Sequence, residues 1–207
     1  MGGDFYDLFH LQGDRGWAAV LGDVCGKGTE AAALTALARH TIRAESDEVA
    51  PADVLGRLNR AVLRDSTDSR FLTATYAWLW REDGGLHGRL ARGGHPPALV
   101  VRADGSVETL CPRGPLLGVM PDTDFAESAF SLREGDSLVL FSDGVVEARS
   151  PSGDLFGLHR MIALTSRLAG AGAEAMADAV ETALAMFESG GTRDDLALLI
   201  LTVKALD

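Results

Sequence analysis

The stretch GGDFYDLFHLQGDRGWAAVLGDVCGKG (residues 2–28) contains two short apolar segments joined by a turn. Residues 4–11 and 17–21 are rich in apolar and aromatic side chains, and residues 12–16 carry the Gly and Asp typical of turns. We predict a β-hairpin with Asp4 at the start of one strand and Asp23 at the end of the other. Because these two ends meet in an antiparallel pair, the two carboxylates are expected at the same end of the hairpin.

Two more aspartates occupy similar positions further along the chain. Asp143 follows an apolar run at residues 137–142, and Asp194 precedes another at residues 196–203. A carboxylate at the end of a buried strand is costly unless it is paired, so four of them predict a shared cation. Without a His or Cys cluster the ligands would all be oxygen atoms, which favours Mg²⁺ or Mn²⁺ over zinc. The sequence therefore indicates a metal-dependent hydrolase, although each Asp taken alone is equally typical of a turn or helix cap.

The remaining pattern predicts an α+β fold. Apolar residues at helical spacing predict helices from Thr29 and Pro51, over residues 158–168 and over residues 174–187. Strands are predicted at residues 71–80, 86–91, 98–102, 107–110, 137–142 and 196–203, the last two nearly continuous in apolar residues and so covered on both faces. This order predicts stacked, mainly antiparallel sheets with helices on their outer faces.

Size and composition narrow the class of protein. The chain has 207 residues, of which 46% are hydrophobic, and residues 1–207 are predicted to form a single soluble domain. The net charge of −11 disfavours nucleic acid and anionic membranes as partners. Two cysteines are too few for a disulfide framework, which favours a cytoplasmic location, and neither a membrane span nor a signal peptide is predicted. Because a motif stands at the very start, we expect a fragment that lacks an upstream strand and a sensor domain.

Five motifs occur in order: GGDFYD (2–7), GDVCGKG (22–28), GGHPP (93–97), FSDGVVE (141–147) and RDDLAL (193–198). Together they resemble the SpoIIE/RsbU-type branch of the PPM (protein phosphatase 2C) family of metal-dependent Ser/Thr phosphatases. The resemblance runs from Gly2 to about Val203. Each motif alone is weakly specific, but five in order at this spacing are strongly specific.

The resemblance implies an αββα sandwich with two Mn²⁺ or Mg²⁺ ions at one end. By position it implies that Asp4, Asp23, Asp143 and Asp194 are metal ligands, that Asp23 bridges both ions, and that the Val24 carbonyl adds an oxygen. A metal-activated water would attack the phosphoserine or phosphothreonine of a bacterial signalling protein, with Asp23 and Asp143 central to catalysis. The resemblance further suggests a phosphorylated STAS-like anti-anti-sigma factor as substrate and a homodimer as a possible assembly.

Lys27, Arg92 and His95 are candidates for substrate binding. Lys27 lies in the glycine loop and could attract the substrate phosphate, but a solvated lysine is the more common explanation. Arg92 stands where the family pattern usually has Asn. His95 is suited to proton transfer near neutral pH, yet a histidine between Gly and Pro more often fixes a loop.

Three further residues near the motifs are assigned structural roles. Cys25 is expected to be a small buried residue, Thr73 to face the core, and Asp195, which like Asp7 neighbours a proposed ligand, to have a structural or surface role rather than to bind a metal-bound water.

Two other functions remain open at this point. The chain could be a catalytically silent module that uses the same fold to bind phosphoproteins, although the presence of all four proposed ligands argues against this. An enzyme for small phosphate esters is the third possibility, which the sequence does not separate from a protein phosphatase.

Overall fold

The computed structural model describes residues 3–47, 50–65, 70–82, 84–188 and 196–204. These residues divide into two compact units. The first comprises residues 1–97 and 111–131, and the second comprises residues 98–110 and 132–207. Each unit is described by itself below.

The first unit is built on a five-stranded sheet with strand order β1-β2-β3-β4-β7. The N-terminal hairpin is confirmed: β1 pairs antiparallel with β2, which pairs antiparallel with β3, which pairs antiparallel with β4. A short 3₁₀ turn, η1 (Gln12–Asp14), joins the first two strands. The strands are β1 (Asp4–His10), β2 (Trp17–Val24), β3 (Leu72–Glu82), β4 (Gly85–Gly93) and β7 (Glu127–Leu132).

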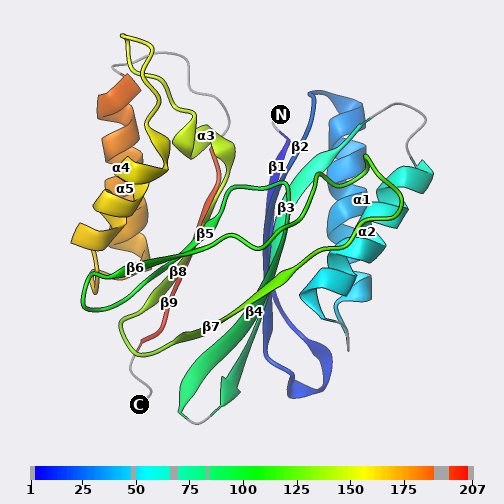
Figure 1. The fold of residues 1–207 in the computed structure, drawn as a ribbon, viewed down its shortest axis with the longest axis horizontal. Coiled ribbons are helices and arrows are strands. Elements are labelled where there is room, and N and C mark those ends of the chain that lie inside the picture. Colours follow the sequence, from blue (N-terminus) through cyan, green and yellow to red (C-terminus); the bar gives the residue numbers. More distant parts are fainter. Residues whose placement is uncertain (1–2, 48–49, 66–69, 83, 189–195, 205–207) are drawn as a thin grey trace. The chain divides into compact units, whose positions relative to one another are not determined.

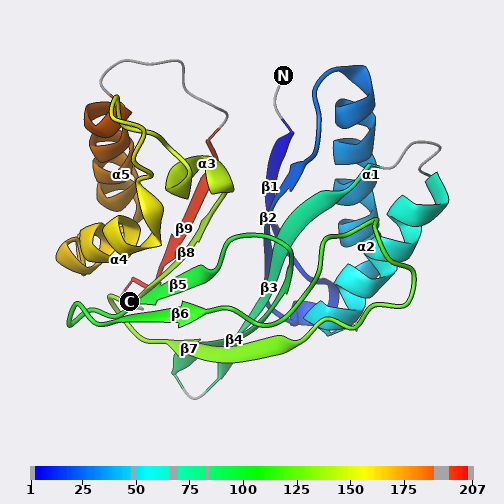
Figure 2. The same ribbon diagram turned by 45° about the horizontal axis from the view of Figure 1, so that its top comes forward.

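Two helices cover one face of this sheet, α1 (Thr29–Glu45) and α2 (Pro51–Asp65), as Figures 1 and 2 show. The apolar side chains of both helices pack against every second residue of each strand. These are the strand residues whose side chains point to the helix side, because side chains of a strand alternate between the two faces of the sheet. The opposite face of the sheet carries the other set of side chains. The helix-side core includes Leu34, Ala38, Ile42, Val54, Leu55, Leu58, Val62, Phe5, Val20, Leu72 and Tyr76.

The second unit is built on a four-stranded sheet with strand order β6-β5-β8-β9, in which every neighbouring pair is antiparallel. Its strands are β5 (Ala98–Val101), β6 (Val107–Leu110), β8 (Ser137–Phe141) and β9 (Leu198–Thr202). Its helices are α3 (Asp143–Val146), α4 (Gly157–Arg167) and α5 (Ala173–Glu188). The core of this unit includes Leu99, Val139, Phe141, Met161, Met176, Val180 and Leu184.

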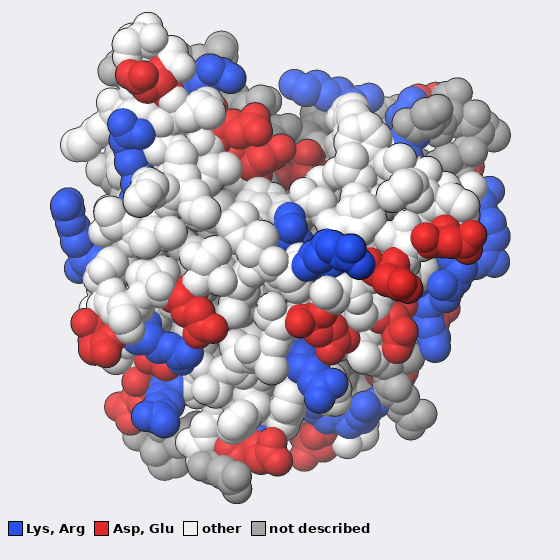
Figure 3. All heavy atoms as spheres, in the orientation of Figure 1, with Lys and Arg blue, Asp and Glu red and all other residues white. Residues whose placement is uncertain are grey.

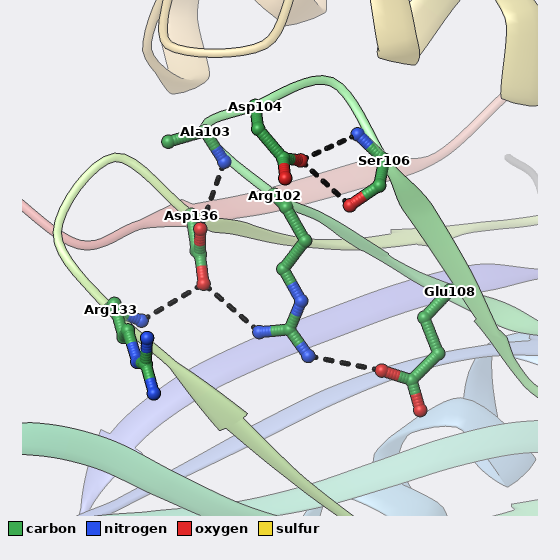
Figure 4. Close-up of polar contacts among 7 residues, drawn as sticks. All are labelled: Arg102, Ala103, Asp104, Ser106, Glu108, Arg133 and Asp136. Atoms are coloured by element: carbon green, nitrogen blue, oxygen red, sulfur yellow. Dashed lines mark hydrogen bonds and ion pairs between the residues drawn. The ribbon is translucent and has the colours of Figure 1, made fainter.

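A buried carboxylate joins two turns of this unit (Figure 4). The two oxygens of Asp136 accept hydrogen bonds from the main-chain N–H groups of Arg133 and Ala103 and from the Arg102 guanidinium. Arg102 also pairs with Glu108. Burial alone would raise the pKa of Asp136, but these hydrogen bonds and the Arg102 charge together hold it below its usual value. The network fixes the β5–β6 turn against the turn that leads into β8.

The predicted α+β class with two mainly antiparallel sheets and helices is confirmed. Strand β7 was not predicted, because its six residues carry only a short alternating pattern. The expectation that residues 196–203 form a strand covered on both faces is wrong. Every residue of β9 is half-buried, since β9 is the last strand of its sheet, whereas β8 is buried throughout.

None of the helices in the described ranges combines the length and apolar character that crossing a bilayer requires. That residues 1–207 form a single domain stays a prediction, as does the cytoplasmic location.

Candidate metal centre

Asp4 and Asp23 lie directly opposite each other in the β1–β2 pairing. Phe5 and Val24, their neighbours along the strands, point into the core beneath α1 and α2. The two aspartates therefore point to the other face of the sheet, where both side chains are half-buried. Like charges on directly opposite residues repel each other, and a divalent cation bound between them would remove that repulsion. The hairpin register thus brings together two of the four predicted ligands.

Gly3 allows the backbone to pass very close to these groups. Its carbonyl accepts a hydrogen bond from the Val24 N–H, so the ladder continues one residue beyond β1. A Cβ atom at Gly3 would lie 2.1 Å from the Val24 carbonyl oxygen and 2.5 Å from Asp23 Oδ1. Only glycine fits there, because real Cβ atoms do not come this near to other heavy atoms. The Val24 carbonyl is therefore close to the Asp23 carboxylate, and its role as a metal ligand stays a prediction.

The glycine loop that follows β2 (residues 25–28) is held by contacts near both of its ends. The Cys25 N–H donates to the Phe71 carbonyl, and Arg70 pairs with Glu30 in the first turn of α1. Lys27 is exposed between these anchors. The expectation that Cys25 is buried is wrong, because the chain leaves the sheet after Val24 and the Cys25 side chain is exposed.

The second unit places Asp143 at the first position of α3, immediately after β8. The Asp143 side chain is exposed. Ser142 and Ala197 exchange two hydrogen bonds: Ser142 N–H donates to the Ala197 carbonyl, and Ala197 N–H donates to Ser142 Oγ. The end of β8 is thereby fixed beside the segment that follows the RDD motif. The predicted ligand Asp194 itself lies outside the described residues.

His95 is held in a rigid setting at the end of β4. The residue is 1% exposed, and its Nδ1 lies 2.8 Å from Thr73 Oγ1. The preceding Gly94 adopts a left-handed conformation with φ of +66°, and its N–H donates to the Gly114 carbonyl. The loop-fixing alternative for His95 is thus supported by these contacts, while its binding of substrate stays a prediction.

Arg92 contributes to the same arrangement. Its guanidinium donates to the His95 carbonyl at 2.6 Å and to the Pro112 carbonyl at 3.2 Å. An arginine at this position therefore holds the loop by main-chain contacts. Substrate binding by Arg92 or by Lys27 stays a prediction.

Thr73 is a residue whose place the sequence did not reveal. It lies directly opposite Asp23 in the β2–β3 pairing, on the face that carries both aspartates, and is half-buried rather than enclosed in the helix-side core. Residues 70–75 also resemble the family, but only the strand register shows that Thr73 stands opposite Asp23, because the two residues are far apart in the sequence.

Asp7 has a structural role, whereas Asp195, the neighbour of Asp194, lies outside the described residues. It points to the helix side of the sheet, where Arg43 binds both of its oxygens and Arg39 lies 3.6 Å away. The hydrogen bonds from Arg43 hold the pKa of Asp7 below its usual value and outweigh the opposing effect of burial.

The oxygen atoms near Asp4 and Asp23 fit a hard divalent cation. Two carboxylates and an adjacent main-chain carbonyl are the ligand types that Mg²⁺ and Mn²⁺ prefer. In the part of the chain that the structure describes, no group of three or more Asp, Glu, His or Cys side chains is close enough to hold a metal ion. The Asp4–Asp23 pair supplies two carboxylates, and the prediction that Asp143 and Asp194 are further ligands stays a prediction.

A family model described as Stage II sporulation protein E (SpoIIE) matches residues 13–204. The chain belongs to the SpoIIE family. This confirms the predicted SpoIIE/RsbU-type branch of the PPM phosphatases. The match covers all the helices and every strand named above except β1, so membership rests on nearly the whole chain.

Curated relatives of this SpoIIE-family chain are longer than the chain itself. It is 28% identical over 207 residues to phosphoserine phosphatase RsbU of Bacillus subtilis, which covers 99% of this chain and 60% of RsbU. It is 31% identical over 186 residues to protein IcfG of a Synechocystis strain, which covers 77% of this chain and 29% of IcfG.

Solved structures agree on the fold. The SiaA-PP2C domain of Pseudomonas aeruginosa superposes with a TM-score of 0.83 at 24% identity, covering 98% of this chain and 81% of that one. The RsbU and RsbW domains of a Mycobacterium tuberculosis protein superpose with a TM-score of 0.77 at 27% identity, covering 99% of this chain and 56% of that one.

The charged side chains on one face of the molecule are mixed in sign (Figure 3). Among the described residues on that face, groups of Asp and Glu and groups of Lys and Arg both occur, separated by uncharged residues. The prediction that nucleic acid and membranes are not partners stays a prediction.

Proposed function

We propose that this chain is a Mn²⁺- or Mg²⁺-dependent protein phosphatase that hydrolyses phosphoserine or phosphothreonine. The observation that carries the proposal is the directly opposed Asp4–Asp23 pair, with the Val24 carbonyl held beside it by Gly3. A like-charge pair at a strand end is unfavourable by itself, and binding of a cation makes it favourable. Membership of the SpoIIE family and the similarity to a phosphoserine phosphatase support the same conclusion.

Asp4, Asp23, Asp143, Asp194 and the Val24 carbonyl would hold two ions. Bound divalent cations would supply an activated water and positive charge that shields the phosphoryl oxygens. The protein's own contribution is to hold the carboxylates in place. The hairpin register fixes Asp4 and Asp23, and the paired hydrogen bonds between Ser142 and Ala197 fix the strand end that carries Asp143. Lys27, which is exposed in the glycine loop, is proposed to contact the substrate phosphate, whereas Arg92 and the buried His95 are proposed to act by holding the loop after β4.

The substrate is proposed to be a phosphorylated bacterial signalling protein, specifically a STAS-like anti-anti-sigma factor. Support comes from relatives rather than from the site. One curated relative is a phosphoserine phosphatase named RsbU, and one similar structure contains RsbU and RsbW domains in one protein. A homodimer is proposed on the same ground of family resemblance.

The decisive experiment measures phosphate release from a phosphoserine peptide and from a small aryl phosphate, with Mn²⁺, Mg²⁺ or EDTA. Asp23→Ala and Asp143→Asn variants are assayed beside the unmodified chain, with Asp122→Asn as a control because Asp122 is an exposed loop residue. Metal-dependent release that both ligand variants abolish and the control retains supports the proposal. A preference for the aryl phosphate would favour the small-ester enzyme instead.

Calorimetric titration with Mn²⁺ separates the remaining outcomes. A folded chain can bind Mn²⁺ and still hydrolyse neither a phosphopeptide nor a phosphorylated STAS protein. We would interpret that result as an inactive state of the proposed phosphatase. A folded chain that does not bind Mn²⁺ would contradict the two-ion site and favour the catalytically silent binding module.

A further inference from the structure

Three strands of the first unit place Asp4, Asp23 and Thr73 in one row. Asp4 is opposite Asp23 in the β1–β2 pairing, and Asp23 is opposite Thr73 in the β2–β3 pairing. Directly opposite residues have their Cβ atoms about 4.5–5.5 Å apart and their side chains on the same face. The Thr73 hydroxyl is therefore within reach of the Asp23 carboxylate, directly or through one water molecule.

The Thr73 hydroxyl is also in contact with His95. The distance between Thr73 Oγ1 and His95 Nδ1 is 2.8 Å. His95 cannot easily move away, because its ring is buried and its carbonyl is held by the Arg92 guanidinium. The hydroxyl is thus held by a buried imidazole on a residue that stands directly opposite Asp23.

The direction of these contacts depends on which ring nitrogen of His95 carries the proton. A threonine hydroxyl has one proton to donate, and a carboxylate only accepts. If His95 Nδ1 carries its proton and donates it to Oγ1, the Thr73 proton is left for the Asp23 side. Residues that hydrogen-bond to a metal ligand in this way fix the orientation of the ligand and raise the affinity of the site for the metal.

We propose that Thr73 is a positioning residue of the metal centre, and that His95 acts through it. The Thr73 hydroxyl, oriented by His95, donates to the Asp23 carboxylate and holds it in the orientation that binds a divalent cation. This inference rests on the proposed function, since it concerns the same metal site, but it assigns roles to two side chains that are not ligands themselves.

The test measures Mn²⁺ affinity by calorimetric titration, independently of turnover. Thr73→Val keeps the shape of the side chain and removes the hydroxyl, and it should weaken Mn²⁺ binding about tenfold. Thr73→Ser restores the hydroxyl and should bind Mn²⁺ nearly as well as the unmodified chain.

Thr75→Val is the matched control. Thr75 lies two residues along the same strand on the same face, opposite Leu21 and Arg92 rather than an aspartate. Its buried hydroxyl makes no hydrogen bond within the described part of the chain. This variant should leave Mn²⁺ affinity unchanged.

A second pair of variants tests His95. His95→Asn keeps an N–H donor near the position of Nδ1 and should retain most of the affinity, whereas His95→Leu should weaken binding about as much as Thr73→Val. Because His95 is proposed to act through Thr73, adding His95→Leu to Thr73→Val should produce no further loss. If the fold-loss of Mn²⁺ affinity in the double variant equals the product of the two single losses, the role of His95 is overturned.

The outcomes for this proposal and for the proposed function are distinct. Failure of the unmodified chain to bind Mn²⁺ overturns both. If the unmodified chain binds and a folded Thr73→Val variant binds equally well, or Thr75→Val is weakened to the same degree, only the role of Thr73 is overturned. Should Thr73→Val not fold, the comparison of Thr73→Ala with Thr73→Ser and of His95→Leu with His95→Asn decides in its place.

Discussion

Asp7 and Arg43 join the first strand to the first helix through two hydrogen bonds. Arg43 Nε lies 2.7 Å from Asp7 Oδ2, and Nη2 lies 2.8 Å from Oδ1. The Asp7 side chain is 9% exposed, whereas that of Arg43 is 51% exposed and also packs over the Phe9 ring. Asp7 is three residues beyond Asp4, so this ion pair fixes β1 against α1 close to the candidate metal centre.

Replacing Asp7 with Asn should lower the free energy of unfolding by about 1–3 kcal/mol near neutral pH, because the amide can accept only one of the two hydrogen bonds. The pKa of Asp7 in the folded chain is below the ordinary value of 3.8. Its stabilising effect is therefore fully present above that value and is lost as the pH falls through the lower, folded-state pKa.

Urea unfolding at about pH 7, 5 and 3 measures this effect as the difference between the unmodified chain and Asp7→Asn. The difference should shrink at the lowest pH. Asp14→Asn is the control, because the Asp14 side chain is 99% exposed and its substitution should change little. A difference that grew on acidification would contradict the role given to this ion pair.

Replacing Asp23 with Asn should abolish stabilisation by Mn²⁺ without unfolding the apo chain. The substitution removes one of two directly opposed carboxylates, so apo stability should stay the same or rise. A ligand that binds only the folded state raises Tm as its concentration rises above Kd. Thermal unfolding with and without Mn²⁺ should show a shift for the unmodified chain and for Asp122→Asn, and none for Asp23→Asn. An equal shift for Asp23→Asn would place the metal elsewhere.

Replacing Gly3 with Ala should weaken Mn²⁺ binding by about tenfold or more, because the start of β1 must move. The added Cβ would meet the Val24 carbonyl and Asp23 Oδ1, and overlap of this kind is relieved only by a shift of the backbone. Gly26→Ala is the contrasting variant. Gly26 has φ of +110° and open space where a Cβ would lie, so alanine there adds backbone strain of about 1 kcal/mol and no close contact. Calorimetric titration measures the Mn²⁺ affinity of both variants, and Gly3→Ala should lose more affinity than Gly26→Ala. Equal losses would show that the short contacts of a Cβ at Gly3 are not what weakens binding.

Replacing Asp136 should destabilise the second unit whether Asn or Ala takes its place. Oδ1 accepts from Ala103 and Oδ2 from Arg133 and Arg102, so an amide satisfies only one side of this network. We expect a loss of about 2 kcal/mol in the free energy of unfolding for either variant.

Asp104→Asn is the control for Asp136 because Oδ1 of Asp104 accepts both hydrogen bonds from Ser106, which an amide oxygen can also do. Denaturant unfolding monitored by hydrogen exchange of the β5 and β8 amides measures both variants. A neutral Asp136→Asn variant would show that the network contributes little.

Much of the fold could be predicted from the sequence. The hairpin, the helices after Thr29 and Pro51, and the buried strand β8 follow from apolar periodicity and turn residues, which depend on near neighbours in the chain. The opposed pair of Asp4 and Asp23 could also be predicted, because a hairpin brings its two ends together whatever lies outside it.

Other features depended on contacts between distant segments. Strand β7 has a weak pattern of its own and is stabilised where Phe130 packs over Gly88, which has no side chain to block it. The half-burial of β9 follows from its place at the edge of a sheet rather than from its apolar composition.

The sequence by itself determined the family, the α+β class and the pairing of Asp4 with Asp23, because motifs, periodicity and a hairpin are local properties. Only the tertiary structure decided that Thr73 stands beside Asp23, that His95 holds Thr73, and that Arg92 holds the His95 loop. The first two relationships join residues far apart in the chain, and strand register, which aligns whole strands at once, sets which of them meet.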